Sequence, residues 1–156
     1  SEALCALALF TPAAIPGLTL GCAIANVANI ALSGTGMLGL LDVAFGSLAT
    51  FAGACFTWKM RKHPLVALAG PVIANALIVP AYLPILLQAT GFYTIPFTSI
   101  SLDGAWPLMY LFGLVTTGAG EAVIMYVLGY PLSKSLARTP YFKADSPFAE
   151  ARGASH

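Results

Sequence analysis

Long apolar runs separated by short polar connections make up most of this chain. No Asp, Glu, Lys or Arg occurs in residues 3–41, 43–58 or 63–102. Within these runs apolar residues follow one another without the alternation of a half-buried strand, so the pattern predicts helices and not the strands of a barrel. A helix needs about 20 such residues to cross a bilayer. Several runs are long enough to do so.

The polar connections divide the sequence into one short apolar piece and four candidate spans. The short piece, residues 2–10, cannot span alone, and the two prolines and the glycine within residues 11–17 predict a turn after it. Prolines at 71, 80 and 84 are expected to bend the third span. The candidate spans are residues 17–32, 37–58, 64–89 and 106–132.

Basic residues form two clusters with a pair of spans between them. The clusters are Lys59, Arg61 and Lys62, and Lys134, Arg138 and Lys143. Short basic loops face the cytoplasm, and two spans return the chain to the same side. We therefore expect a multi-pass protein of the cell membrane with a cytoplasmic C-terminus. Residues 1–136 form the membrane domain in this interpretation, and residues 137–156 a polar, disordered cytoplasmic tail.

The composition excludes a soluble domain. Hydrophobic residues make up 58% of the chain and charged residues 8%, whereas soluble domains carry about 25% charged residues. The formal net charge of +1 gives no argument for a nucleic-acid partner. Three cysteines, Cys5, Cys22 and Cys55, lie within apolar runs without metal-ligand spacing, so we expect neither a metal site nor a disulfide.

One carboxylate near the middle of the last span needs an explanation. A charged side chain at the bilayer centre costs roughly 2.5–3.5 kcal/mol on insertion scales, so Glu121 is expected to face a protein interior or a wet cavity. Other polar residues lie within or at the margin of the spans: Glu2, Asn26, Asn29, Asp42, Asn75 and Gln88. Under the topology above, one pocket open to the outside can collect several of these side chains.

The polar residues within the spans point to a ligand that donates hydrogen bonds. No Lys or Arg within a span matches the carboxylates, which therefore require donors, a metal ion or a proton. A guanine-like ring suits them, because its ring N–H and exocyclic amine form a fork that a carboxylate such as Glu121 accepts. Asn75, with Asn26 or Asn29, can serve the other edges of the ring. Aromatic residues toward the outer side can stack on it: Tyr82, Phe92, Trp106 and Tyr110.

Each of these polar residues also has a purely structural interpretation. Hydrogen bonds between helices can be formed by Asn26, Asn29 and Asn75. Asp42, close to the loop at residues 33–36, can cap a helix. Glu2 lies at the margin of the membrane domain, so its role depends on what precedes it. These alternatives remain open from the sequence alone.

Catalytic and nucleotide-binding motifs are missing from the sequence. His63 lies in a basic loop and His156 in the tail, and there is no GxSxG, HExxH or GxxxxGK[ST] pattern. We therefore expect no enzymatic activity, no cofactor and no metal ion.

Six sequence segments together resemble one family of membrane proteins. "SEAL", "TPAAIPG", "GCAIAN", "LLDVAFGSLAT", "NALIV" and "GEAVIMYVLGYPL" follow one another in the order found in the QueT family, over roughly residues 1–136. These proteins are the substrate-capturing S components of energy-coupling factor (ECF) transporters. The resemblance implies an all-α membrane bundle of six transmembrane helices, of which about five are expected here because the first helix is missing before "SEAL".

The resemblance also implies a substrate and partners. The substrate is a queuosine precursor, a 7-deazaguanine base or queuine itself, and import requires a transmembrane coupling protein and two ABC ATPases. By combining this with the residues above, we expect the substrate on Glu121, Asn75, Asn26, Asn29, Asp42, Glu2, Trp106 and Tyr110. Two alternatives stay open, an S component for a different vitamin and a structural membrane subunit without a ligand.

Overall fold

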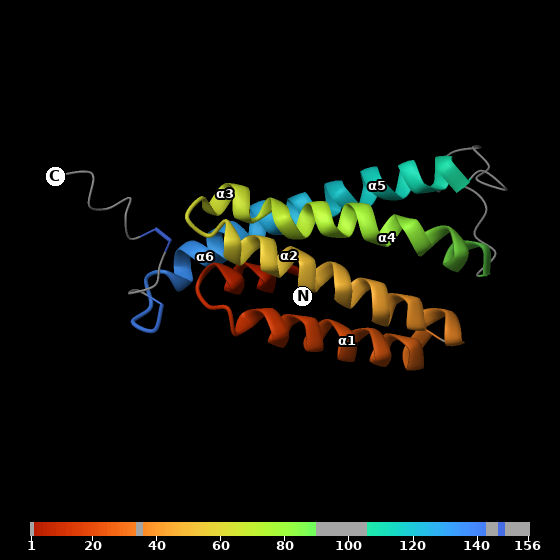
Figure 1. The fold of residues 1–156 in the computed structure, drawn as a ribbon, viewed down its shortest axis with the longest axis horizontal. Helices are drawn as coiled ribbons and strands as arrows, with labels where there is room; N and C mark the ends of the chain where they lie inside the picture. The colour runs from red at the N-terminus through yellow and green to blue at the C-terminus, as the bar shows by residue number, and fades with distance from the viewer. Residues whose placement is uncertain (1, 34–35, 90–105, 143–146, 149–156) are drawn as a thin grey trace.

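The computed structural model describes residues 2–33, 36–89, 106–142 and 147–148. This part of the chain is almost entirely helical, and its long helices run along one common axis (Figure 1). The α-helices are α1 (Ala14–Ser33), α2 (Ser47–Lys59), α3 (Pro64–Ala67), α4 (Ala69–Ala89), α5 (Trp106–Val123) and α6 (Tyr130–Leu136). The remaining elements are the 3-10 helices η1 (Glu2–Leu9) and η2 (Gly36–Gly39) and the π-helices η3 (Asp42–Gly46) and η4 (Ile124–Gly129).

Three helical stretches of the described residues are long and apolar enough to cross a membrane. They are Ala14–Leu32, Pro64–Tyr82 and Trp106–Leu136. Between the first two, η3 passes directly into α2 and runs antiparallel to α1 (Figure 1). Large side chains such as Leu20, Ile24 and Val27 are more than half exposed, as lipid contact requires. The predicted all-α membrane fold is thus confirmed.

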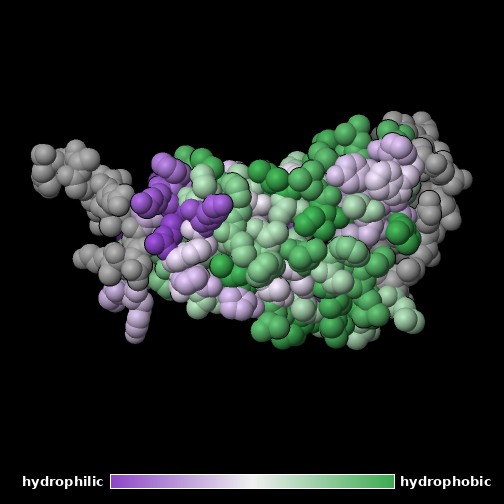
Figure 2. Space-filling model, viewed as in Figure 1, coloured by the Kyte–Doolittle hydropathy of each residue, from purple (hydrophilic) through white to green (hydrophobic). Residues whose placement is uncertain are grey.

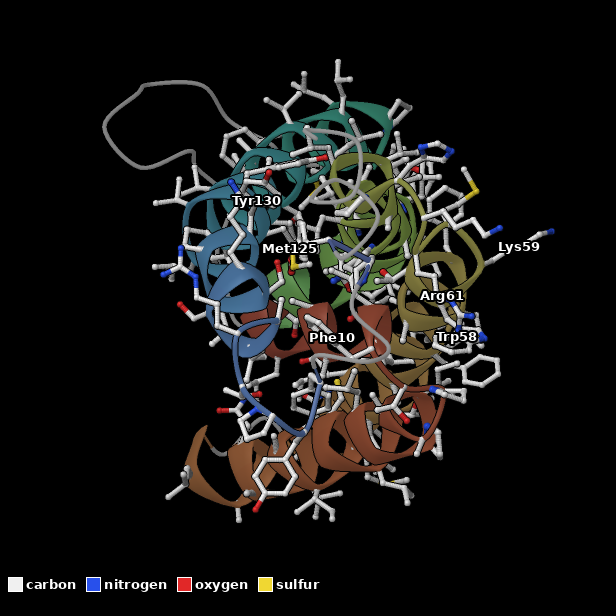
Figure 3. All side chains as sticks on the ribbon, turned by 90° about the vertical axis from the view of Figure 1, so that its left-hand side faces the viewer. Phe10, Trp58, Lys59, Arg61, Met125 and Tyr130 are labelled. Carbon is white, nitrogen blue, oxygen red and sulfur yellow. The ribbon has the colours of Figure 1, made fainter. Side chains whose placement is uncertain are left out.

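The two ends of the bundle differ in polarity. Apolar residues cover much of the face seen in Figure 2, and the most hydrophilic residues gather at its left end. Figure 3 looks onto that end and shows Lys59 and Arg61 beside Trp58. The Arg61 guanidinium lies 3.7 Å from the centre of the Trp58 ring, and the Lys134 ammonium lies 4.4 Å from that of Tyr130. We call this the basic end.

An apolar core fills the bundle at the basic end. Its buried residues are Cys5, Ala6, Leu9, Phe10, Ala67, Leu68, Met125 and Ala137. Figure 3 shows Phe10 and Met125 at the centre of this end. Two aromatic residues beyond α6 pack onto it, because the Phe142 ring lies 5.1 Å from Phe10 and the Phe148 ring 6.1 Å from Tyr130. Only residues 137–142 and 147–148 of the predicted tail are described.

Small residues bring neighbouring helices into close contact. A Cβ atom on Gly53 of α2 would lie 2.7 Å from the Pro71 Cα of α4, and one on Gly118 of α5 would lie 3.3 Å from the Ala76 Cβ. The first distance leaves no room for a side chain. Lipid provides no hydrophobic driving force between helices, so the van der Waals contacts of such close approach hold the helices together instead.

The prolines of the third span have different consequences. Pro71 lacks an N–H group and cannot bond the Ala67 carbonyl, and the helix is interrupted at Leu68, between α3 and α4. The buried Thr57 hydroxyl lies 3.0 Å from this carbonyl and 2.9 Å from the Gly53 carbonyl, so its one hydrogen is shared between the acceptor that Pro71 leaves open and its own helix. Pro80 and Pro84 lie inside α4 without ending it.

Candidate functional site

A cavity of about 260 Å³ lies where six helical elements meet. It is lined by residues of η1, α1, η3, α2, α4 and α5, so side chains far apart in the sequence converge on it. The lining residues are Glu2, Cys22, Asn26, Asp42, Gly46, Thr50, Asn75, Val79, Tyr82, Thr117 and Glu121.

Glu121 of α5 is held in the cavity by Asn75 of α4. The Asn75 side-chain nitrogen donates to Glu121 Oε1 at 3.1 Å, and Asn75 is only 5% exposed. Glu121 Oε2 is buried and has no hydrogen-bond partner. An unsatisfied buried acceptor is unfavourable, and more so when it is charged. The Glu121 carboxylate is therefore held in one orientation, and its Oε2 could accept a hydrogen bond from a ligand.

Glu2 adds a second carboxylate beside the first. The short helix η1 carries Glu2 at its start, where it lines the cavity, and its charge acts directly on Glu121. The Cys5 thiol, one turn further along η1, lies 3.8 Å from Glu2 Oε2. A thiol is a weak donor, so this contact is a weak one.

The third carboxylate, Asp42, belongs to the π-helix η3. Asn26 of α1 donates its side-chain N–H to the Asp42 backbone oxygen at 2.8 Å and lies 3.5 Å from Cys22 Sγ. The Asp42 side chain is hydrogen-bonded by the Tyr82 hydroxyl of α4. These contacts join α1, η3 and α4 around one side of the cavity.

Tyr82 is the aromatic residue among the described lining side chains. It is 5% exposed and stacks on Phe45 of η3, with ring centroids 5.5 Å apart and an interplanar angle of 25°. Gly46, one turn after Asp42, lies against the same group, since a Cβ there would lie 3.0 Å from Asn26 Nδ2 and 3.9 Å from the Tyr82 hydroxyl. Gly46 therefore keeps space open in the cavity.

Five of the eight predicted binding residues line this cavity: Glu2, Asn26, Asp42, Asn75 and Glu121. The other three, Asn29, Trp106 and Tyr110, are not lining residues. Asn29 is an exposed residue of α1, rotated away from Asn26 because three helical residues fall short of a full turn.

Trp106 and Tyr110 are placed elsewhere by contacts of their own. Their rings stack on each other with centroids 5.3 Å apart, and the Tyr110 hydroxyl donates to the Leu77 backbone oxygen at 3.2 Å. The pair thus lies on the flank of α4 and α5. Of the other candidates, Phe92 and the side chain of Gln88 lie outside the described residues.

Sequence reasoning missed five further lining residues, Thr50 and four others that share a simple spacing. Cys22 precedes Asn26 by four residues, Thr117 precedes Glu121 by four, Val79 follows Asn75 by four, and Gly46 follows Asp42 by four. Residues four apart lie on the same face of a helix. A search one helical turn before and after each predicted polar residue would have identified these four.

The described residues contain no group of three His, Cys, Asp or Glu side chains arranged to hold a metal ion. The described lining of the cavity carries carboxylate, amide, hydroxyl and phenol groups, which can donate and accept hydrogen bonds to a small polar ligand.

A helical bundle with three helices able to cross a membrane and a small polar cavity among its elements is the architecture of a membrane protein. The comparison with family models specifies the class further. The model of the QueT transporter family matches residues 1–138, and the chain belongs to this family. The resemblance seen in the sequence is thereby confirmed, and so is a role in membrane transport. No curated protein and no solved structure matches the chain.

Proposed function

We propose that the protein is the S component of an ECF-type importer and that it captures a queuosine precursor, a 7-deazaguanine base or queuine, in the cavity on Glu121. Membership of the QueT transporter family supports the class of protein and of substrate. The geometry of the cavity supports the assignment of the residues.

The observation that carries the proposal is the oriented but incompletely bonded carboxylate of Glu121. Asn75 occupies one lone pair of Oε1, and Oε2 has no donor. A 7-deazaguanine presents its ring N–H and exocyclic amine as two parallel donors. Such a fork completes the carboxylate with two charge-assisted hydrogen bonds, which a flat apolar ligand cannot do.

The rest of the cavity suits the remaining parts of a small fused ring. Thr117 lies one turn from Glu121 on α5, Asn75 lies opposite on α4, and Tyr82 adds an aromatic side chain. A volume of about 260 Å³ is just below the ~300–1,000 Å³ of pockets for drug-sized ligands. A two-ring base with a short substituent suits this size better than a flavin with its ribityl chain.

The transport cycle follows from this placement. The basic end faces the cytoplasm by the charge asymmetry of its loops. The substrate enters from the opposite side and binds on Glu121. The loaded protein then docks on a transmembrane coupling protein driven by two ABC ATPases and topples, so that the cavity opens toward the cytoplasm. The largely apolar surface leaves few charges to resist this rotation.

The test is calorimetric binding to the purified intact protein in lipid nanodiscs. Queuine and the aminomethyl and cyano 7-deazaguanines are compared with guanine, riboflavin and thiamin. Selective binding of deazaguanines is expected, and Glu121→Gln should weaken it about tenfold to a hundredfold, since a hydrogen bond to a charged group contributes about 1.5–3 kcal/mol.

Two asparagines provide a matched control for this experiment. Asn75→Ala removes the amide that orients Glu121 and should weaken binding, whereas Asn29→Ala removes an amide outside the lining and should leave binding unchanged. If no deazaguanine binds, or if Asn29→Ala weakens binding as much as Asn75→Ala, the assignment of substrate and site is wrong.

A further inference from the structure

Several threonine hydroxyls of the bundle bond to the backbone of their own helix. Thr19 and Thr50 donate to the carbonyl oxygen four residues earlier, at 2.8 and 3.0 Å. Thr116 of α5 does the same, with its hydroxyl 2.8 Å from the Phe112 oxygen. A hydroxyl has one hydrogen, so these side chains have no further hydrogen to donate to a ligand.

Thr117, the next residue on α5, differs from Thr116. It lines the cavity, and its hydroxyl makes no hydrogen bond to any other residue that the structure describes. The other amide, hydroxyl and phenol groups of the described lining each donate to a partner in the protein; they belong to Asn26, Thr50, Asn75 and Tyr82. The Thr117 hydroxyl is therefore a donor that the cavity keeps available for a ligand.

The position of Thr117 relative to Glu121 indicates which part of a ligand it can reach. The two residues are four apart on α5, so they share one face of the helix, with Thr117 about 6 Å nearer the start of α5. This start lies at the end of the bundle opposite the basic end (Figure 1). In a 7-deazaguanine the ring carbonyl lies beside the ring N–H of the donor fork, on the same edge. When Glu121 binds the fork and this edge lies along α5, the carbonyl points to Thr117.

We infer that Thr117 is a specificity-determining residue, which donates its hydroxyl hydrogen to the ring carbonyl next to the donor fork. This inference rests on the proposed function and refines it, because it gives the bound ring an orientation with the carbonyl directed away from the basic end. A base with a poor acceptor in place of this carbonyl keeps the fork on Glu121 but loses the hydrogen bond to Thr117.

The experiment compares queuine and the aminomethyl and cyano 7-deazaguanines, each with its 6-thio analogue. Sulfur, a weaker acceptor, replaces the carbonyl oxygen in the analogue, and the donor fork is retained. Calorimetry on the intact protein in lipid nanodiscs should show tighter binding of the oxo compound. Thr117→Val removes the hydroxyl with little change of shape and should reduce the ratio of the two affinities about threefold to tenfold, the contribution of a neutral hydrogen bond. Thr117→Ser keeps the hydroxyl and should keep the ratio.

Thr116→Val is the matched control, because it removes the hydroxyl of the neighbouring residue, which bonds its own helix and does not line the cavity. It should leave the ratio unchanged. An unchanged ratio in Thr117→Val, or an equal fall in Thr116→Val, overturns the inference and leaves the proposed function standing. Equal affinity of the oxo and thio compounds for the unchanged protein also overturns it, and this comparison needs no variant to fold. If none of the oxo compounds binds, the proposed function fails as well.

Discussion

Buried positions around the cavity and buried positions at the basic end are occupied by different kinds of side chain. Around the cavity, Asn75 and Thr50 are at most 5% exposed, and Glu121 has a buried oxygen without a partner. At the basic end, Leu9, Leu68 and Met125 are fully buried among other apolar residues. The buried side chains at the basic end pack against one another, whereas the cavity contains a carboxylate oxygen that could accept a further hydrogen bond. We therefore expect substitutions at the basic end to affect mainly stability, and substitutions around the cavity to affect mainly the proposed binding.

The largest effect is expected where both regions depend on the same helix contact. Gly53→Val should abolish the folded protein, because its side chain would occupy the space of the Pro71 backbone, 2.7 Å away, and separate α2 from α4. The measurement is the yield of monodisperse protein on size-exclusion chromatography. Gly120→Val is the control, since a Cβ at Gly120 has nothing within 4 Å, and it should fold. Normal yield of Gly53→Val would contradict the close packing.

The second prediction separates stability from binding. Leu9→Ala should destabilise the protein by about 2–5 kcal/mol, because the smaller side chain leaves an empty space in the apolar core. The thermal unfolding midpoint measures this loss. Binding of the ligand to the folded fraction should stay unchanged, because Leu9 does not line the site. A loss of affinity at a temperature where Leu9→Ala is fully folded would show that the two regions are not separate.

The third prediction tests the reverse case, in which Gly46→Ala changes binding but not stability. Its methyl group would lie 3.0 Å from Asn26 Nδ2 and fill part of the cavity, so affinity for the ligand should fall about tenfold, equivalent to about 1.4 kcal/mol. The unfolding midpoint without ligand should change little, because alanine favours helix over glycine. Gly21→Ala, on α1 with nothing within 4 Å, controls for the gain in helix propensity. Unchanged affinity in Gly46→Ala would mean that ligands do not use this side of the cavity.

The smallest effect concerns the aromatic residues that cover the basic end. Phe142→Ala removes the ring 5.1 Å from Phe10 and should cost about 0.5–1.5 kcal/mol beyond the loss of buried area. Thermal unfolding measures it, and Tyr141→Ala, which removes an 89% exposed ring, is the neighbouring control. Equal effects of the two substitutions would place Phe142 outside the core.

The sequence predicted the helices well, since unbroken apolar runs bounded by basic residues and glycine-proline turns leave few alternatives. Glu121 and Asn75 were found because single polar residues stand out within apolar runs. Their mutual hydrogen bond joins residues 46 positions apart, and no local pattern contains that pairing. It depends on how α4 packs on α5.

The details of the site depended on helix rotation and irregular turns. Asn26 and Asn29 look equivalent in the sequence, and only the orientation of α1 separates the lining residue from the exposed one. The π-helix η3 changes the direction in which the side chains after it point. Its sequence contains no signal that predicts a π-helix. Trp106 and Tyr110 were expected near the ligand because of their aromatic rings, but they stack on each other instead.

The helix η1 gives the cavity a mechanical connection to the opposite side of the membrane domain. Its eight residues, at about 2 Å of rise per residue, lead from Glu2 in the cavity to Phe10 at the basic end. A hydrogen-bonded rod of this length does not absorb a displacement within itself. We therefore expect a ligand that displaces Glu2 along the bundle axis also to move Phe10 against Phe142 at the basic end.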